Sequence, residues 1–398
     1  MTHRGRLALV LGGATYLGAW AFGSKPLYPV ALGLFAAVLL ARIWTRLAGR
    51  PVALLRRLPS AERYEGDDVQ VRLRIELERA HAPATVVVRE RISKLGERET
   101  LVPARNARSY VLHALPRGRY VFEKTTVVIE DPFGLYRIEQ PLSAPGALLI
   151  YPRLVELDRL FSESGRLGRD GRRLLLRRPA GFDLHSVREY ERGESLRKVH
   201  WRSTAKRGQL MVKELEDSPR DDVAVVLDAD PAAVVGESFE VQVRAAGSLL
   251  FGHSRRGRRA VLVVNSMRRE YQRVHSSAGD RREALDLLAA VEPEPGPSLG
   301  ALLADEAGAA ARAEELAVVT GSLPATLVEQ LVNHALGHKG VSVVLVDSAS
   351  FVAGETRSAF PGLLRLQAAG IAVAVLRRGD DLAARLSAGA AREEAAHA

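Results

Sequence analysis

The chain of 398 residues contains no cysteine. This excludes disulfides, thiolate-bound metal sites and a cysteine nucleophile. Acidic residues are missing from positions 1–57, which hold eight lysines and arginines. Several motifs that mark enzymes are missing as well: we find no P-loop, no G-x-S-x-G, no H-E-x-x-H and no dinucleotide fingerprint. The sequence therefore supports no familiar enzyme class, and it is more informative about architecture and location.

The net charge of +10 is concentrated in two regions. One is the acid-free segment 1–57, and the other is 165–215, which has fourteen basic and six acidic residues. A basic chain can indicate nucleic-acid binding. Here, however, half of the excess flanks apolar segments, where contact with a membrane is the simpler explanation.

The N-terminal region predicts a membrane hairpin. Segments 7–24 and 26–41 carry no charge, and the second extends to Leu47 if Arg42 reaches the headgroups. A spanning helix needs about 20 residues, with a lower limit of roughly 17. Arginines flank both outer ends, whereas the turn has only Lys25, so the positive-inside rule places the soluble part in the cytoplasm. The alternative is a signal peptide cleaved near 19–21.

Segment 52–152 predicts a β-rich domain. Residues 69–77 alternate apolar and polar side chains, as in a strand with one buried face. We expect further strands at 85–89, 109–114, 119–123, 125–129 and 148–151, separated by turn signals at 116–118 and 131–134. Short strands without intervening helices favour an immunoglobulin-like sandwich. No catalytic constellation is present, which indicates a spacer or an interaction module.

Segment 181–216 has the densest mixture of charge, glycine and aromatic residues. Its arginines suit carboxylates or phosphates. One hypothesis is an internal network of ion pairs; a second is a basic surface that docks a partner or the anionic inner leaflet; a third is binding of an anionic ligand or nucleic acid by 165–215. The candidate binding residues are Arg188, Tyr190, Gly193, Arg197, Trp201, Arg202, Lys206, Gly208 and Glu214.

From 221 onward, strands and helices alternate. The apolar run 223–227 is typical of a strand that is buried on both faces. We expect further strands at 260–265, 270–274, 316–320, 341–346 and 371–376, and helices at 239–251, 281–291, 299–311, 326–336 and 357–369. This alternation predicts a doubly wound α/β domain over 221–380, followed by a tail, 381–398.

The central segment closely resembles the signature of a bacterial family. The run from Arg188 to Glu214 reads R-E-Y-x-x-G-E-x-x-R-x-x-H-W-x-x-x-A-K-R-G-x-L-x-V-K-E. It is similar to the domain of unknown function 58 (DUF58) family, with departures at Val187, Glu194, His200 and Ser203. Blocks at 117–120, 131–135 and 151–152 also match, as does the membrane hairpin. The resemblance covers about residues 1–380.

The resemblance implies an architecture and a location. Its parts are a transmembrane hairpin (1–50), a β-sandwich (52–152), the signature segment (153–220) and a von Willebrand factor A-like domain (221–380). It implies a two-pass protein of the bacterial inner membrane whose soluble domains face the cytoplasm. Family members are often encoded beside a MoxR-type AAA+ ATPase and a transglutaminase-like membrane protein, which are the partners we expect.

Von Willebrand A-like domains carry a metal-ion-dependent adhesion site, D-x-S-x-S, with a later Thr and a later Asp. Asp228 fits the first position, but Asp230 replaces the first Ser and Ala232 cannot coordinate. Ser298 is a candidate for the Thr, and Gly321-Ser322 stands where the Asp is expected. Two ligands are lost, so we expect no metal site, and Asp228 and Asp230 form a solvated pair or cap the following loop.

The function we expect is that of a membrane-anchored, non-catalytic interaction or scaffold protein. It would act with the AAA+ ATPase in assembly related to the cell envelope. We assign no catalytic, cofactor or metal residue. Two alternatives stay open: a metal-dependent hydrolase that uses Asp228 and Asp230, and binding of an anionic ligand or nucleic acid by 165–215.

Overall fold

The computed structural model describes most of the chain, in two compact units, Met1–Arg153 and Leu154–Ala398. The predicted domain boundaries stay predictions. The described residues are 1–47, 51–77, 85–103, 107–157, 159–161, 183–189, 204–206, 208–216, 222–268, 270–275, 277–337, 339–352 and 360–387.

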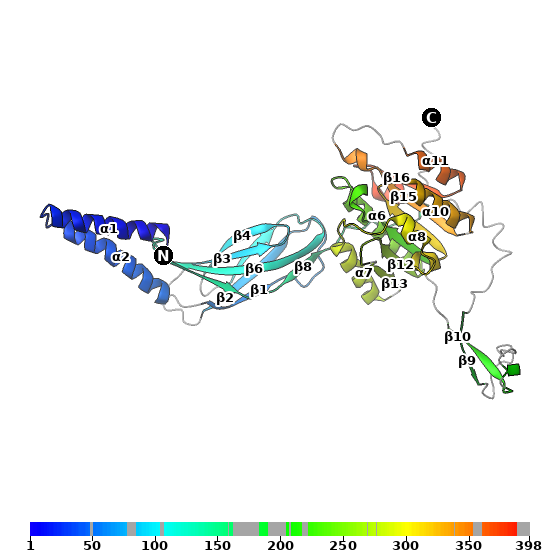
Figure 1. Ribbon diagram of the computed structural model, residues 1–398, viewed down its shortest axis with the longest axis horizontal. Coiled ribbons are helices and arrows are strands. Elements are labelled where there is room, and N and C mark those ends of the chain that lie inside the picture. Colours follow the sequence, from blue (N-terminus) through cyan, green and yellow to red (C-terminus); the bar gives the residue numbers. More distant parts are fainter. Residues whose placement is uncertain are drawn as a thin grey trace. The chain divides into compact units, whose positions relative to one another are not determined.

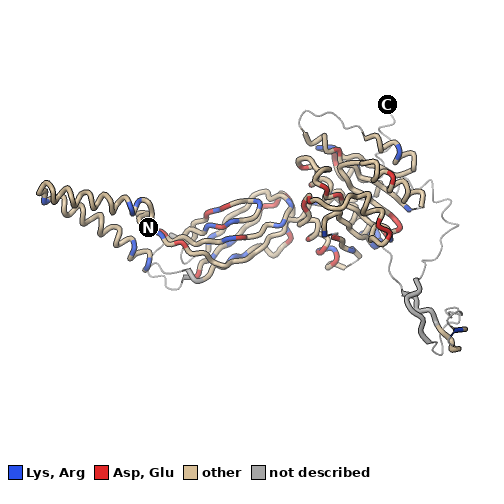
Figure 2. Tube along the Cα trace, in the orientation of Figure 1, with Lys and Arg blue, Asp and Glu red and all other residues tan. Residues whose placement is uncertain are grey.

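The first unit begins with two helices that pack against each other, α1 (His3–Ala21) and α2 (Leu27–Leu47) (Figure 1). The hydroxyl of Thr2 caps α1 by accepting from the backbone N–H of Gly5. Among the described residues, α2 is the one helix long and apolar enough to cross a membrane. Both helices expose large apolar side chains, and basic residues lie near their outer ends (Figure 2).

Two antiparallel sheets follow and share one hydrophobic core. The first has the order β1-β2-β5, and the second has the order β4-β3-β6-β7, with β8 also paired to β6. The strands are β1 (Pro51–Arg57), β2 (Val69–Leu77), β3 (Thr85–Ile92), β4 (Gly96–Pro103), β5 (Arg108–Leu112), β6 (Gly118–Glu130), β7 (Arg137–Leu142) and β8 (Ala147–Ile150).

A buried ion pair bridges the two sheets. Arg56 on β1 and Glu90 on β3 have side chains that are 3% and 1% exposed, and their closest atoms are 2.5 Å apart. The guanidinium also donates to the hydroxyl of Thr125 and lies 3.9 Å from the ring centre of Phe122. The other carboxylate oxygen of Glu90 accepts from the hydroxyl of Tyr110 at 2.8 Å. These contacts satisfy the buried charges of both partners.

The second unit is built on a six-stranded sheet with the order β13-β12-β11-β14-β15-β16 (Figure 1). All neighbouring strands are parallel except β12 and β13. The strands are β11 (Val223–Leu227), β12 (Ala260–Val264), β13 (Tyr271–Val274), β14 (Glu315–Thr320), β15 (Gly340–Val346) and β16 (Ala372–Leu376). The unit is therefore an α/β domain, in agreement with the coarse prediction.

Helices cover the sheet of the second unit. The residues of α8, α9, α10 and α11 share a core with alternate residues of the strands, whereas α6 contacts β11, β12, β14 and β15, and α7 contacts β13. The helices are α6 (Ser238–Arg255), α7 (Ala278–Ala290), α8 (Leu299–Ala304), α9 (Ala309–Arg312), α10 (Ala325–Leu336), α11 (Pro361–Ala368) and α12 (Leu382–Leu386), with short 3₁₀ turns η2 (Pro231–Ala233) and η3 (Ser348–Phe351).

Candidate functional site

The signature segment is described only in part. Arg188 lies on β9 (Asp183–Glu189) and Glu214 on β10 (Met211–Glu216), which pair antiparallel with Arg188 opposite Val212 and Ser186 opposite Glu214. Lys206 is exposed on a short helical piece, 204–206, and Gly208 has a φ of 71°, as expected of a residue that ends a helix. Tyr190, Gly193, Arg197, Trp201 and Arg202 lie outside the described residues, as does the helix expected after Ser195.

The hypotheses for this segment consequently stay predictions. Most of 165–215 lies outside the described residues, so neither the internal ion-pair network nor a basic docking surface can be traced there. If this segment binds nucleic acid, its affinity must fall steeply with salt, because binding releases counterions.

A second candidate site lies where β11 and β14 end, the point at which the strand order reverses direction. Open α/β sheets usually bind ligands in the crevice at this point. Asp228 follows β11 and is 3% exposed. Its Oδ1 accepts from the side-chain amide of Asn265 at 2.9 Å and from the backbone N–H of Asp230 at 3.2 Å. Its Oδ2 accepts from the hydroxyl of Thr320 at 2.6 Å.

The partners of Asp228 are themselves fixed. The Oδ1 atom of Asn265 accepts from the N–H of Ala229 at 2.6 Å, which orients its amide toward Asp228. The hydroxyl of Thr320 accepts from the N–H of Ser322 at 3.1 Å. Burial raises the pKa of Asp228, although hydrogen bonds from Thr320, Asp230 and Asn265 oppose the shift. The carboxylate is thus a buried structural acceptor rather than part of a solvated pair, which corrects that part of the expectation.

Two loops close over these strand ends. A Cβ atom on Gly296 would lie 2.0 Å from the carbonyl oxygen of Asn265, and one on Gly321 would lie 2.1 Å from that of Ala233. Only glycine permits such a close backbone approach. The N–H of Glu294 also donates to the carbonyl of Ala229 at 3.0 Å. These contacts place both loops directly against the strand ends at the switch point.

The residues around Asp228 do not fit a hard cation, which needs several free oxygen ligands. Both oxygens of Asp228 already accept bonds, while Asp230 caps η2 by accepting from the N–H of Ala232 at 3.0 Å. Ser298 caps α8 instead, by accepting from Ala301, so the hydroxyl at Asp228 comes from Thr320. No group of three or more metal-binding side chains occurs within the described ranges.

The close approach at Gly321 predicts a measurable loss of stability. Alanine at this position would push the backbone away from Ala233, and overpacking of this kind costs about 1–3 kcal/mol. We expect faster amide hydrogen exchange in β11 and β14 of Gly321→Ala in the full chain. Gly279→Ala is the matched control, because its Cβ would meet only the Ser277 hydroxyl at 3.7 Å. Equal exchange in the two variants would contradict this interpretation.

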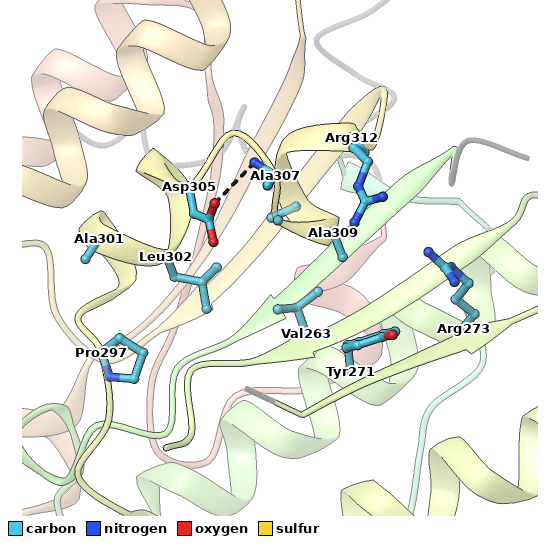
Figure 3. A pocket seen from close by; sticks show the side chains of 12 residues that line it. Val263, Tyr271, Arg273, Pro297, Ala301, Leu302, Asp305, Ala307, Ala309 and Arg312 are labelled. Carbon is cyan, nitrogen blue, oxygen red and sulfur yellow. Dashed lines mark hydrogen bonds between the residues drawn. The ribbon is translucent and has the colours of Figure 1, made fainter. Parts of the chain in front are cut away.

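An open pocket of about 250 Å³ lies elsewhere on the second unit, between the edge of the sheet and the α8–α9 connection. Its lining is mainly apolar, with Val263, Pro297 and Leu302 among the contributors. Figure 3 shows Arg273 and Arg312 at one end of the pocket and Pro297 and Ala301 at the other. The guanidinium of Arg273 lies 5.7 Å from the ring centre of Tyr271. The pocket thus combines an apolar floor with the positive charges of Arg273 and Arg312 and the negative charge of Asp305.

A break in a predicted helix lies in the lining of the pocket. We expected one helix over 299–311, but α8 ends at Ala304 and α9 begins at Ala309. The carboxylate of Asp305 accepts from the N–H of Ala307 at 3.1 Å, and the N–H of Gly308 donates to the carbonyl of Asp305 at 2.9 Å. An Asp followed by Gly three residues later is a turn signal that could have revealed the break.

A different signal could have revealed the buried polar cluster. Asp228, Asn265 and Asp347 directly follow the strands β11, β12 and β15, and Thr320 is the last residue of β14. The carboxyl ends of parallel strands meet at one edge of a sheet, so polar residues at these positions lie together. All four are at most 3% exposed. Of these four residues, only Asp228 was a predicted site residue.

Comparison with known proteins supports the family resemblance. Residues 186–352 match the family model described as "Protein of unknown function DUF58". The uncharacterized protein YeaD of Bacillus subtilis (strain 168) is 26% identical over 159 residues, which cover 39% of this chain and 38% of the relative. The chain thus spans about two fifths of the length of that curated relative. The matched region contains most of β9, all of β10 and the strands β11 to β15, so the similarity to the DUF58 family lies in the signature segment and most of the α/β sheet.

Proposed function

We propose that this protein is a membrane-anchored, non-catalytic interaction protein. The observation that carries the proposal is the apolar surface of the paired helices α1 and α2. Leu11, Leu17, Trp20, Leu32 and Leu40 are each at least half exposed there. Exposed apolar surface on this scale is unfavourable in water and is typical of a membrane contact. The two helices would form a two-pass hairpin in the inner membrane, with the soluble units in the cytoplasm.

The folds of the soluble units support a role in binding rather than chemistry. We propose that the two-sheet unit is an immunoglobulin-like sandwich and that the second unit is von Willebrand A-like, with a degenerate adhesion site. The hydrogen bonds on Asp228 and the cover provided by the loops at Gly296 and Gly321 support the degenerate assignment. The alternative of a hydrolase that uses Asp228 and Asp230 would need an accessible carboxylate pair, which this packing disfavours.

The pocket at the α8–α9 connection offers a place for a partner to bind. An apolar side chain next to a carboxylate would complement its floor and the guanidiniums of Arg273 and Arg312. We propose that an acidic, apolar segment of a partner protein binds there. The candidate partners are a MoxR-type AAA+ ATPase and a transglutaminase-like membrane protein, acting in envelope-related assembly.

Crosslinking and co-purification from native membranes test the proposal. We expect the wild-type chain to recover the ATPase or the membrane partner, and Arg312→Glu to lose about tenfold or more of that recovery, because a reversed charge opposes an acidic segment. Ala301→Phe should act similarly by filling the pocket, since Ala301 is exposed at its rim. Arg282→Glu makes the same charge change on α7 and should recover the partner normally. Repeated recovery of neither partner by the wild type would refute the assignment.

A further inference from the structure

The turn between β6 and β7 exposes an aromatic side chain on a rigid support. Phe133 is 77% exposed. The buried carboxylate of Asp131 accepts from the backbone N–H groups of Phe133 at 2.9 Å and Tyr136 at 2.5 Å. The N–H of Gly134, whose φ is 67°, donates to the carbonyl of Asp131 at 3.0 Å. Phe133 is therefore held in an outward position by a fixed turn.

The same turn is bonded to the beginning of α1. The hydroxyl of Thr2 donates to the carbonyl of Gly134 at 2.6 Å, and the N–H of Thr2 donates to that of Leu135 at 3.2 Å. The first turn of α1 lies so close that a Cβ on Gly5 would be 2.2 Å from the Leu135 oxygen. A guanidinium nitrogen of Arg4 would be 3.6 Å from a Cβ on Gly134. Phe133 thus lies near the level at which α1 begins.

The beginning of α1 corresponds to the polar interface of a bilayer that this helix would enter. The charge-free run begins at Leu7, five residues after Thr2, and a helix rises 1.5 Å per residue, so the run starts about 7–8 Å further along α1. The polar layer on each side of a bilayer is roughly 5–8 Å thick. Aromatic side chains favour this layer, and cations such as Arg4 are attracted to anionic headgroups there.

We propose that the turn Asp131–Tyr136 is a membrane-contacting surface, with Phe133 inserted among the lipid headgroups at the leaflet where α1 begins. The partner of this surface is the lipid itself. The contact would fix the two-sheet unit close to the membrane, in addition to the covalent link through the helices. The proposal rests on the membrane anchoring proposed above, and it gives a role to a motif of the sequence that the interaction pocket does not use.

Because the chain has no cysteine, single labels can test this contact in the full-length protein. The protein is reconstituted in vesicles of phosphatidylethanolamine and phosphatidylglycerol, with or without brominated acyl chains, and a bimane label is attached at Pro132→Cys. We expect brominated lipid to quench this label when Phe133 is present and to lose most of that effect in Phe133→Ser. Leu39→Cys on α2 is the membrane control, and Leu101→Cys on β4 is the aqueous control, with wild-type side chains 58% and 60% exposed.

Each outcome has one meaning. Quenching at positions 132 and 39 but not at 101, with the loss in Phe133→Ser, supports the proposal. Quenching at 39 alone overturns it while the anchoring by α2 stands. Quenching at 132 that Phe133→Ser leaves unchanged overturns the role of Phe133. No quenching at 39 refutes the membrane anchoring, and this proposal with it.

Discussion

Glu90→Ala should destabilise the two-sheet unit by about 3–5 kcal/mol, because it leaves the guanidinium of Arg56 buried without its counter-charge. Arg56 would keep its bonds to the hydroxyl of Thr125 and the carbonyl of Ala144, but these are neutral acceptors. Tyr110 would also lose the acceptor of its hydroxyl, which is 2.8 Å from Glu90. Burial and the neighbouring Glu90 carboxylate raise the pKa of Tyr110, so its hydroxyl stays a donor at every pH of the experiment.

The measurement is amide hydrogen exchange of β3 and β6 in the full chain, as a function of denaturant. Glu99→Ala is the matched control, because Glu99 pairs with Arg89 at the surface of the same sheet. An exposed pair contributes less than about 1 kcal/mol, so this variant should exchange almost like the wild type. Tyr110→Phe removes only the hydroxyl and should cost about 1 kcal/mol. Equal effects of Glu90→Ala and Glu99→Ala would show that the buried pair does not hold the sheets together.

The strand patterns show what the sequence could predict in this unit and where it failed. The alternation of apolar and polar residues was sufficient to predict β2 and its buried face, since Val69, Val71, Leu73 and Ile75 are buried as expected. Segments 119–123 and 125–129 were predicted as two strands, but both belong to the single strand β6. A register shift at Arg91/Ile92 leaves two adjacent exposed residues, Glu123 and Lys124, on the opposite strand. A bulge of this kind breaks the alternation without ending the strand.

Three strands of the two-sheet unit were not predicted at all. The strand β1 follows the membrane segment, and its Arg56 and Arg57 were interpreted only as flanking charges. The strands β4 and β7 have few apolar residues, because one of their faces is exposed. Strands of this kind depend on their neighbours in the sheet more than on their own composition. The strands of the α/β unit were easier to predict. In β11, for example, every residue is buried and apolar.

The candidate site depended even more on tertiary contacts. Asp228 could be selected because it follows an apolar strand, but its partners Asn265 and Thr320 are 37 and 92 residues away in the sequence. Spacing within a motif cannot show that an amide and a hydroxyl saturate this carboxylate. Nor could it show that Gly296 and Gly321 bring two loops over it. The sequence pattern predicted that Asp228 lacks a complete set of metal ligands, but it did not predict the buried polar residues that bond to this carboxylate.

Substitution of Asp228 is expected to have the second large effect on stability, and alanine and asparagine should differ sharply at this position. Alanine removes the acceptor of the Asn265 amide and of the Asp230 N–H, which stay buried, and we expect a loss of about 2–4 kcal/mol. Asparagine can keep its oxygen toward these two donors and turn its amide toward Thr320. The Thr320 hydroxyl can then donate to the carbonyl of Ser322, which is 2.9 Å away. Asp228→Asn should therefore lie within about 1 kcal/mol of the wild type at pH 7.

The pH dependence separates a structural carboxylate from a metal ligand. Burial raises the pKa of Asp228 above its unfolded value of about 3.9, and the nearby Asp230 carboxylate adds to this shift. The stabilisation by protonated Asp228 is thus complete below the unfolded pKa and is lost as pH rises through the folded pKa. The stability of the wild type relative to Asp228→Asn should fall from about pH 4 upward and then level off.

Thermal unfolding of the full chain measures both the pH dependence and the effect of Mg²⁺. A cation can bind Asp228 only by displacing Asn265 and Thr320. A rise in Tm with Mg²⁺ that Asp228→Asn abolishes would therefore contradict the structural role of this carboxylate.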